Sequence, residues 1–348
     1  MTHAELWSRH EATIRRFWAG QLRGIASLTP SIFRAPQDAD DATRLALIRE
    51  ALANMVPDPH NVTMPSVYPD YGTISMPVYW GGRCRVSRET GCPFIEPAAQ
   101  TLSEALALRP KPVDDPAMDA ARAVRLWRDC LPGPHRDYLW ARSPDFQSVL
   151  NTAGLIMNQE EMLLAMYEQP EDLQVWLGRV CDFLIELHAW LRRETKGRIC
   201  GSIWPHTVLP ADLGVSLTED LMPLLSADLW KTFGLPHLRR IERAFGPLQI
   251  HCCGDWGRHA PTLLESGLRI RAVEFHYPFT TIEELAPLAR ATGMAIVPYF
   301  IADKQTRFSC MWEYYLWLWK EWPDLRFWFT LGGEPDDENQ AFLRLING

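Results

Sequence analysis

The sequence lacks any long hydrophobic run, and this excludes a membrane-spanning helix. Near the C-terminus the longest strongly apolar stretch is Tyr314–Trp319, six residues long, whereas a membrane span needs about 20. The first twenty residues mix charged and apolar side chains in the pattern of an amphipathic helix. A secretory signal peptide needs an unbroken apolar segment instead. We therefore expect a cytoplasmic protein that does not bind membranes.

Cysteine and excess basic charge are also scarce. Eight cysteines in 348 residues are too few for a disulfide scaffold, so we expect reduced thiols. The 35 Lys and Arg residues against 43 Asp and Glu residues give a net charge of −8, which argues against a nucleic-acid-binding protein. Hydrophobic residues, by contrast, make up 47% of the chain, and tryptophan occurs 15 times. The chain can therefore bury a large core, and we expect its ligand to be a small molecule.

From about residue 117 onward, short apolar runs alternate with helical patterns of ten or more residues. The runs typical of buried strands are Tyr138–Ala141, Ile199–Trp204, Leu248–Cys252, Ile270–Phe275, Ala295–Tyr299 and Phe327–Leu331. This alternation predicts βα units around a parallel sheet. Residues 210–216 are expected to form a loop, with a helix following near 218–226.

Six such units, with two further strands hidden in the irregular first half, predict an α/β fold of the TIM (β/α)8 barrel type. Residues 1–117 would form a mainly helical, loop-rich extension that contributes early barrel elements, and residues 118–348 the main barrel, in one structural domain. A doubly wound open sheet is the alternative, but no strand is followed by a G-x-G-x-x-G turn.

The densest chemistry follows the predicted strand at 248–252, where His251 and Cys253 lie two residues apart. Side chains alternate along a strand, so these two share a face, and imidazole with thiolate can bind Zn²⁺. Glu274 ends the next predicted strand and can reach the same point, and His276 shares its face. Three protein ligands would leave a fourth position open, as catalytic zinc requires. The alternative is that these residues only pack at the rim of the fold.

Other polar residues at the same expected edge are candidates for the substrate pocket. They are Asp145, His206, Asp212 and Tyr299. Asp212 lies in an otherwise apolar loop and is a candidate catalytic proton carrier. Helix capping is the alternative role for Asp145 and Asp212, and packing for His206 and Tyr299.

Two further features have a binding and a structural interpretation. Arg83 and Arg85 would form either an anion-binding patch or a solvated surface. The aromatic run Trp312–Trp322 would form a helix that packs on the barrel or at a homodimer interface.

Several landmarks then occur in a characteristic order. They are Leu213-Gly214, Ser216, Leu221 to Trp230, Leu235-Pro236, His251-x-Cys253-Gly254-Asp255 and Leu331-Gly332-Gly333. In this order they resemble the uroporphyrinogen decarboxylase superfamily, which includes zinc-dependent, corrinoid-linked methyltransferases. The resemblance covers residues 118–348 and implies a TIM barrel with its cleft at the carboxyl ends of the strands.

Within that superfamily the chain is more similar to the methyltransferase branch than to the decarboxylases. The arginine-rich R-Q-A-G-R motif of the decarboxylases is absent, and Gly333 stands where they carry a histidine. The methyltransferase pattern matches His251, Cys253 and Glu274, which implies that these residues bind zinc and that Glu274 acts in catalysis. The last cysteine of that pattern would fall at Gly333, so either Glu334 replaces it or the zinc has three protein ligands.

The resemblance implies a methyl transfer between a small substrate and a corrinoid. The chain has no D-x-H-x-x-G cobalamin-binding stretch, so the corrinoid would be carried by a separate partner protein. Two alternatives stay open. One is a metal-free decarboxylase of a multi-carboxylate, tetrapyrrole-like substrate, which would use Asp212, Arg83 and Arg85. The other is a barrel that binds a ligand without catalysis.

Overall fold

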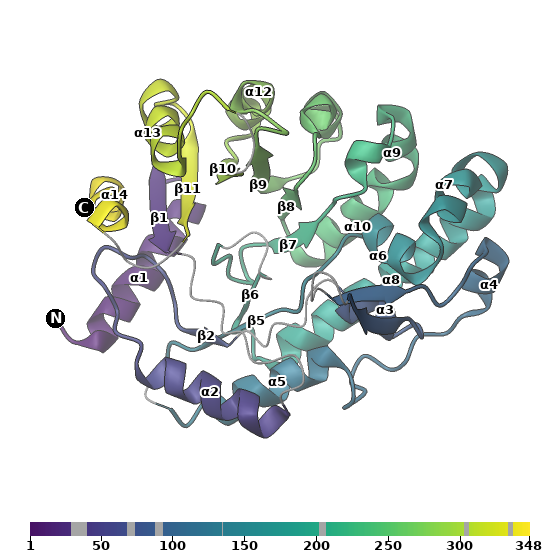
Figure 1. The fold of residues 1–348 in the computed structure, drawn as a ribbon, viewed down its shortest axis with the longest axis horizontal. Coiled ribbons are helices and arrows are strands. Elements are labelled where there is room, and N and C mark those ends of the chain that lie inside the picture. Colours follow the sequence, from purple (N-terminus) through teal and green to yellow (C-terminus); the bar gives the residue numbers. More distant parts are fainter. Residues whose placement is uncertain are drawn as a thin grey trace.

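A parallel sheet of six strands forms the centre of the fold. The computed structural model describes residues 1–28, 40–67, 74–87, 93–133, 135–201, 207–302, 306–332 and 337–348. The six strands are β1 (Gly24–Leu28), β7 (Val215–Thr218), β8 (Leu248–Cys252), β9 (Ile270–Tyr277), β10 (Ala295–Phe300) and β11 (Arg326–Leu331). Their order is β1-β11-β10-β9-β8-β7, and every pair is parallel. In Figure 1 they follow one another along an arc, with α9, α12 and α13 outside it.

Three short strands form a second parallel sheet. They are β2 (Ser66–Val67), β5 (Trp140–Arg142) and β6 (Ile199–Cys200), in the order β2-β5-β6. In the described part of the chain no strand of this sheet pairs with a strand of the first, although an isolated parallel bridge links Gln147, after β5, to Thr218 of β7. The predicted closed barrel is therefore not what the structure shows. The three strands have only two or three residues each and offer few backbone groups for pairing. At the end of β1, the backbone N–H of Leu28 donates to the side chain of Asn61, 3.0 Å away, and not to a neighbouring strand.

The two sheets nevertheless enclose one common interior. The inward-facing residues that pack together there are Ile25, Ala272, Val297 and Trp328 from the large sheet and Trp140 and Cys200 from the small one. Helix α1 (His3–Trp18) fills this interior with Trp7, Phe17 and Trp18. Trp18 stacks on Trp328 with ring centroids 5.4 Å apart. Residues from the predicted extension thus supply both a strand of the main sheet and the helix that closes its interior.

A second, larger core lies between the sheets and the outer helices. The helices are α2 (Asp41–Ala53), α3 (Ser75–Val78), α4 (Leu102–Ala107), α5 (Asp119–Cys130), α6 (Val149–Ile156), α7 (Gln159–Glu168), α8 (Pro170–Glu194), α9 (Ala227–Phe233), α10 (Leu235–Phe245), α11 (Ala260–Glu265), α12 (Ile282–Thr292), α13 (Met311–Glu321) and α14 (Asp337–Asn347), with 3-10 turns η1 (Met222–Leu224) and η2 (Gly257–His259). The helix α8 starts with proline followed by two acids, which favour the positive end of the helix dipole. Among the described helices, none is long and apolar enough to cross a membrane.

Two features of uncertain role in the sequence have clear places in the fold. The aromatic run forms α13, and the hydroxyl oxygen of Tyr315 lies 2.8 Å from the carbonyl oxygen of Pro298 and 3.1 Å from that of Thr330, either of which can accept its hydrogen. This anchors α13 on β10 and β11. Arg85 lies in an antiparallel hairpin of β3 (Arg83–Val86) and β4 (Pro93–Glu96), where its guanidinium pairs with Glu96 at 3.0 Å.

Residues 210–216 differ from the predicted loop and helix. Val215 to Thr218 form strand β7, and its first backbone N–H donates to the carbonyl of Pro247. Gly214 precedes this strand with φ +154°, and a Cβ atom there would collide with that carbonyl oxygen. Glycine therefore allows the chain to approach β8 closely enough for β7 to pair with it.

Candidate metal centre

The carboxyl ends of β8 and β9 bring His251 and Glu274 face to face. The two residues are direct partners in the register of these parallel strands. Their side chains point to the same face, with His251 Nδ1 3.4 Å from Glu274 Oε1. Both side chains are buried. The sequence prediction that these two residues meet at one edge of the sheet is thus matched by the structure.

His276 and Tyr299 extend this cluster along the sheet. His276 follows Glu274 by two residues on the same strand, and its Nε2 lies 3.8 Å from Glu274 Oε1. The ring of His276 packs against that of His251 with centroids 5.2 Å apart, and against Tyr299 with centroids 4.6 Å apart. Tyr299 is the register partner of His276 on β10. Tyr299, a predicted pocket residue, therefore contacts the cluster through His276.

Asp220 approaches the other side of the His251 ring. Its Oδ1 lies 3.8 Å from His251 Nε2 and accepts a hydrogen bond from the backbone N–H of Cys253 at 3.0 Å. The ligand atoms of Asp220, His251 and Cys253 all lie within 4.8 Å of one another, and so do those of His251, Glu274 and His276. Asp220 was not among the predicted site residues, because the strand that it follows, β7, was expected to be a loop. Recognising that strand would have placed Asp220 at the same edge.

The charges in the cluster stabilise one another. Burial lowers the pKa of His251, but Glu274, Cys253 and Asp220 together outweigh burial and raise that pKa well above its usual value. Burial raises the pKa of Glu274, but His251 and His276 outweigh it and bring the pKa to about 2. The second carboxylate oxygen of Glu274, Oε2, has no hydrogen-bond partner among the described residues. Imidazole nitrogens, a thiol and carboxylate oxygens gathered within 4.8 Å of one another in two groups form donor sets that suit a divalent metal such as zinc.

Two more buried carboxyl groups lie beside the cluster. Thr218 donates a hydrogen bond of 3.4 Å to Asp145, and burial raises the pKa of Asp145 to about 6. Glu219 is also buried, its backbone N–H donates to the carbonyl of His251 at 2.8 Å, and burial raises its pKa to about 8. Both groups can hold a proton near neutral pH. Asp145 was a sequence candidate, whereas Glu219 was missed together with strand β7.

Asp212 does not join this cluster. The chain turns back after β6, since the N–H of Ala211 donates to the carbonyl of Ile199 at 3.1 Å. Asp212 therefore precedes β7 and lies toward the amino ends of the strands, where its Oδ2 is 2.8 Å from Arg15 Nη1 on α1. Its side chain is 59% exposed. The role of catalytic pocket residue predicted for Asp212 does not fit this position.

Three other predicted positions lie outside the described residues: His206, Gly333 and Glu334. Among the described residues, the predicted ligand His251 lies in two groups, one with Cys253 and Asp220 and one with Glu274 and His276, so the three predicted ligands do not form a single group. Asp145 and Tyr299 lie beside these groups.

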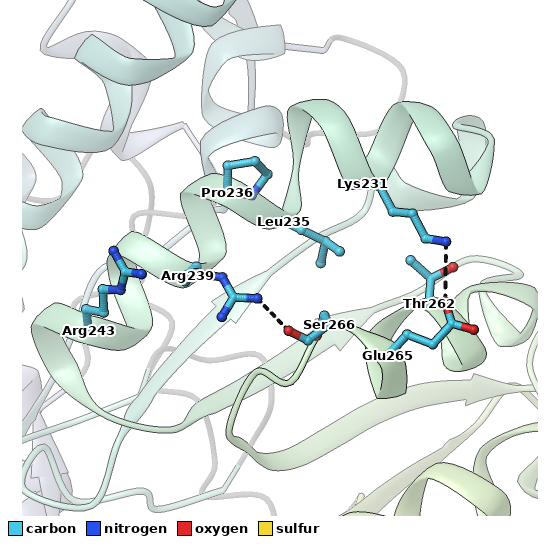
Figure 2. A pocket seen from close by; sticks show the side chains of 8 residues that line it. All are labelled: Lys231, Leu235, Pro236, Arg239, Arg243, Thr262, Glu265 and Ser266. Carbon is cyan, nitrogen blue, oxygen red and sulfur yellow. Dashed lines mark hydrogen bonds and ion pairs between the residues drawn. The ribbon is translucent and has the colours of Figure 1, made fainter.

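A surface groove of about 580 Å³ lies away from this cluster, between α10 and α11 (Figure 2). Three of its charged side chains are engaged with neighbours. Lys231 Nζ is 3.3 Å from Glu265 Oε2, and Arg239 donates to the carbonyl of Ser266. The residues that line the groove include no imidazole and no thiol, so it is not the candidate reaction site.

The fold and this site define an α/β protein with a candidate metal centre at the carboxyl edge of its parallel sheet. No family model matches the chain, and no curated protein matches it. Among solved structures, a methyltransferase from Methanosarcina mazei superposes with a TM-score of 0.61, covering 95% of this chain and 96% of that chain at 11% sequence identity. At this identity the likeness shows a shared fold, and membership of the uroporphyrinogen decarboxylase superfamily stays a prediction.

Proposed function

We propose that the protein is a zinc-dependent methyltransferase that moves a methyl group between a small substrate and a corrinoid carried by a separate protein. The observation that carries this proposal is the pair His251 and Cys253 at the end of β8, with carboxylates on both sides of the imidazole ring. The pair stands where an α/β fold of this type places its chemistry, at the carboxyl ends of parallel strands. The fold shared with a methyltransferase supports the same reaction class.

Bound zinc would supply Lewis acidity, which lowers the pKa of a bound thiol or hydroxyl or polarises the oxygen of a methyl ether. His251 and Cys253 would bind it. The rest of the cluster is rich in carboxylate oxygen, with one thiol only. Harder donors of this kind favour oxygen ligands, so we propose hydroxyl compounds and methyl ethers as the substrate class rather than thiols.

The proton that such a transfer needs would be held by Asp145. Its carboxyl is buried beside the cluster, and its pKa of about 6 lets it both release and accept a proton near neutral pH. The hydrogen bond from Thr218 to its Oδ1 would hold the carboxyl in place for this exchange. In ether cleavage, Asp145 would deliver that proton to the departing oxygen.

The two alternatives gain less support. A metal-free decarboxylase would need Asp212 and basic side chains near the substrate, but Asp212 pairs with Arg15 away from the cluster, and Arg85 pairs with Glu96 in an exposed hairpin. A non-catalytic binding protein would not need buried imidazole and carboxylate groups in mutual contact.

The test is metal content by mass spectrometry on full-length protein purified without an affinity tag or chelator. We expect about one zinc per chain, lost in Cys253→Ala and retained in Cys84→Ala, since Cys84 is also an exposed free cysteine but lies in the β3–β4 hairpin. Demethylation of an aryl methyl ether by the zinc-loaded protein with a reduced corrinoid is the activity readout. Wild-type protein without stoichiometric metal would contradict the proposal.

A further inference from the structure

The two carboxylates of the cluster face opposite nitrogens of one imidazole ring. Glu274 Oε1 lies 3.4 Å from His251 Nδ1, whereas Asp220 Oδ1 lies 3.8 Å from His251 Nε2. A neutral imidazole offers one nitrogen lone pair and carries a hydrogen on the other nitrogen. One metal ion can therefore bind this ring either on the Glu274 side or on the Asp220 side, but not on both.

Exposure distinguishes the two sides. The Glu274 side chain is 2% exposed, and His276 beside it is also buried. The Asp220 side chain is 34% exposed, and Cys253 on the same side is exposed as well. A catalytic metal needs a coordination position that substrate can reach. That position can exist on the Nε2 side of His251, which also carries the thiol of the cluster.

The turn after β8 already holds the Nε2-side ligands together. Asp220 Oδ1 accepts a hydrogen bond from the backbone N–H of Cys253 at 3.0 Å. This hydrogen bond holds the carboxylate next to the residue that carries the thiol. Asp220 closely follows β7, and the backbone N–H of its neighbour Glu219 donates a hydrogen bond to the carbonyl oxygen of His251. The ends of β7 and β8 therefore fix Asp220, His251 and Cys253 relative to one another.

On the basis of the proposed function, we infer that Asp220 is the third protein ligand of the metal, with His251 Nε2 and Cys253 Sγ, and that Glu274 is a positioning residue. Glu274 Oε1, 3.4 Å from His251 Nδ1, would accept the hydrogen of that nitrogen and so hold the tautomer whose Nε2 lone pair faces Asp220 and Cys253. A carboxylate on the far nitrogen of a metal-binding histidine is a recurrent arrangement, and its loss weakens metal binding without abolishing it. His276, 3.8 Å from the same Oε1, keeps Glu274 in place from the other side.

The experiment compares Asp220→Asn with Glu274→Gln in the full chain, each stripped and reloaded with Zn²⁺ or Co²⁺. Both substitutions keep the size and remove the charge, and the amide introduced by Asp220→Asn still offers an oxygen to the N–H of Cys253. We expect Asp220→Asn to weaken Zn²⁺ binding by more than about 100-fold in competition with a chromogenic chelator, and Glu274→Gln by about 10- to 100-fold at most. Asp255→Asn, in the same turn, is the matched control and should bind as wild type does.

The Co²⁺ spectrum gives a readout that does not depend on activity. The thiolate-to-cobalt charge-transfer band should persist in Glu274→Gln, and the ligand-field bands should change in Asp220→Asn. Equal losses in the two variants, or a larger loss in Glu274→Gln, would overturn the assignment of Asp220. If the wild-type chain binds neither metal, the proposed function itself fails, so the two failures are distinguishable.

Discussion

Charged side chains have different surroundings at the two ends of the same parallel sheet. At the amino end of β9, Arg271 donates from Nη1 to the carbonyl of Trp18 (2.9 Å) and from Nε to the carbonyl of Leu213 (3.2 Å). At the carboxyl end of the same strand, Glu274 Oε1 lies 3.4 Å from His251 Nδ1, and the rings of His276 and His251 pack with centroids 5.2 Å apart. One strand thus carries a structural cation at one end and a candidate ligand set at the other.

The difference lies in how completely the polar atoms are bonded. Arg271 anchors α1 and the segment before β7 through backbone carbonyls, which have fixed positions and no proton to exchange. Glu274 Oε2, in contrast, has no hydrogen-bond partner in the described part of the chain. A buried carboxylate oxygen without a partner is expensive for folding unless a ligand fills the gap. For β9, the comparison favours a structural role at the amino end and supports the proposed binding role at the carboxyl end.

The largest effect is expected from removing the shared ligand, His251→Ala. Because it removes a direct ligand, metal binding should weaken by more than about 100-fold, the upper effect of an indirect partner, and demethylation should fall to background. Metal content and turnover measure both. The control is His3→Ala, an exposed histidine on α1. If His251→Ala kept its metal, the metal would have to bind elsewhere. The carboxyl end of the sheet would then no longer be distinguished from the amino end as the metal site.

The sequence could predict the carboxyl ends of β8 and β9 because each strand carries enough apolar residues to stand out between two helical patterns. The observed β8, Leu248–Cys252, has the predicted bounds, and β9, Ile270–Tyr277, extends two residues beyond the predicted run. Alternation then placed His251 and Glu274 on one face. Barrel closure could not be judged in the same way. Strands of two or three residues, such as β2 and β6, are too short for any periodic signal and for a continuous ladder.

Asp212 and Asp220 show why the rest of the site was misplaced. The sequence placed Asp212 after a strand, but the chain folds back at Ala211 and makes it precede the next strand. Strand β7 escaped notice because its four residues include Ser216 and Thr218, which also occur before helices. Both errors come from backbone pairing between distant segments, which local patterns do not encode.

One buried histidine lies away from both ends of the sheet. The pH dependence of folding stability tests its contribution separately from that of either end. His237, on α10, is buried, and its two ring nitrogens have no hydrogen-bond partner in the described residues. Burial lowers the pKa of His237 to about 4, with Arg240 adding to the effect. Because the folded pKa lies below the unfolded value near 6.5, protons bind the unfolded state first. The contribution of His237 to the free energy of unfolding is therefore fully present above pH 6.5. As the pH falls toward 4, protonation of the unfolded chain removes this contribution, which amounts to roughly 3 kcal/mol.

Urea denaturation at pH 7.5 and pH 4.5 checks this expectation. His237→Gln, which cannot titrate, should lose less stability between the two pH values than wild type does. A part of the acid sensitivity should stay, because burial also lowers the pKa of His188 well below its usual value. An unchanged difference between the two pH values in His237→Gln would contradict the expectation.

A smaller effect is expected from Arg271→Ala at the amino end. The substitution removes the two hydrogen bonds to the carbonyls of Trp18 and Leu213, and the unfolding free energy should fall by about 2 kcal/mol. Arg271→Lys keeps the charge but not the fork of donors, so its loss should be intermediate. Metal content should match wild type in both variants. If Arg271→Ala lost its metal under conditions where the protein is fully folded, the two ends of the sheet would not be independent.

The smallest effect is expected from Asp212→Asn, and it tests the comparison most directly. Its pairing with Arg15 is exposed, and an exposed ion pair contributes no more than about 1 kcal/mol to stability. Because Asp212 lies at the amino end, away from His251, metal binding and turnover should equal those of wild type within twofold. Asp145→Asn is the informative counterpart, since Asp145 lies beside the cluster and its loss should lower turnover by about 100-fold with metal retained. A tenfold or greater loss of turnover in Asp212→Asn, with its metal intact, would instead restore the proton-carrier role that the sequence predicted, and would mean that the segment before β7 moves to the other end of the sheet during the reaction.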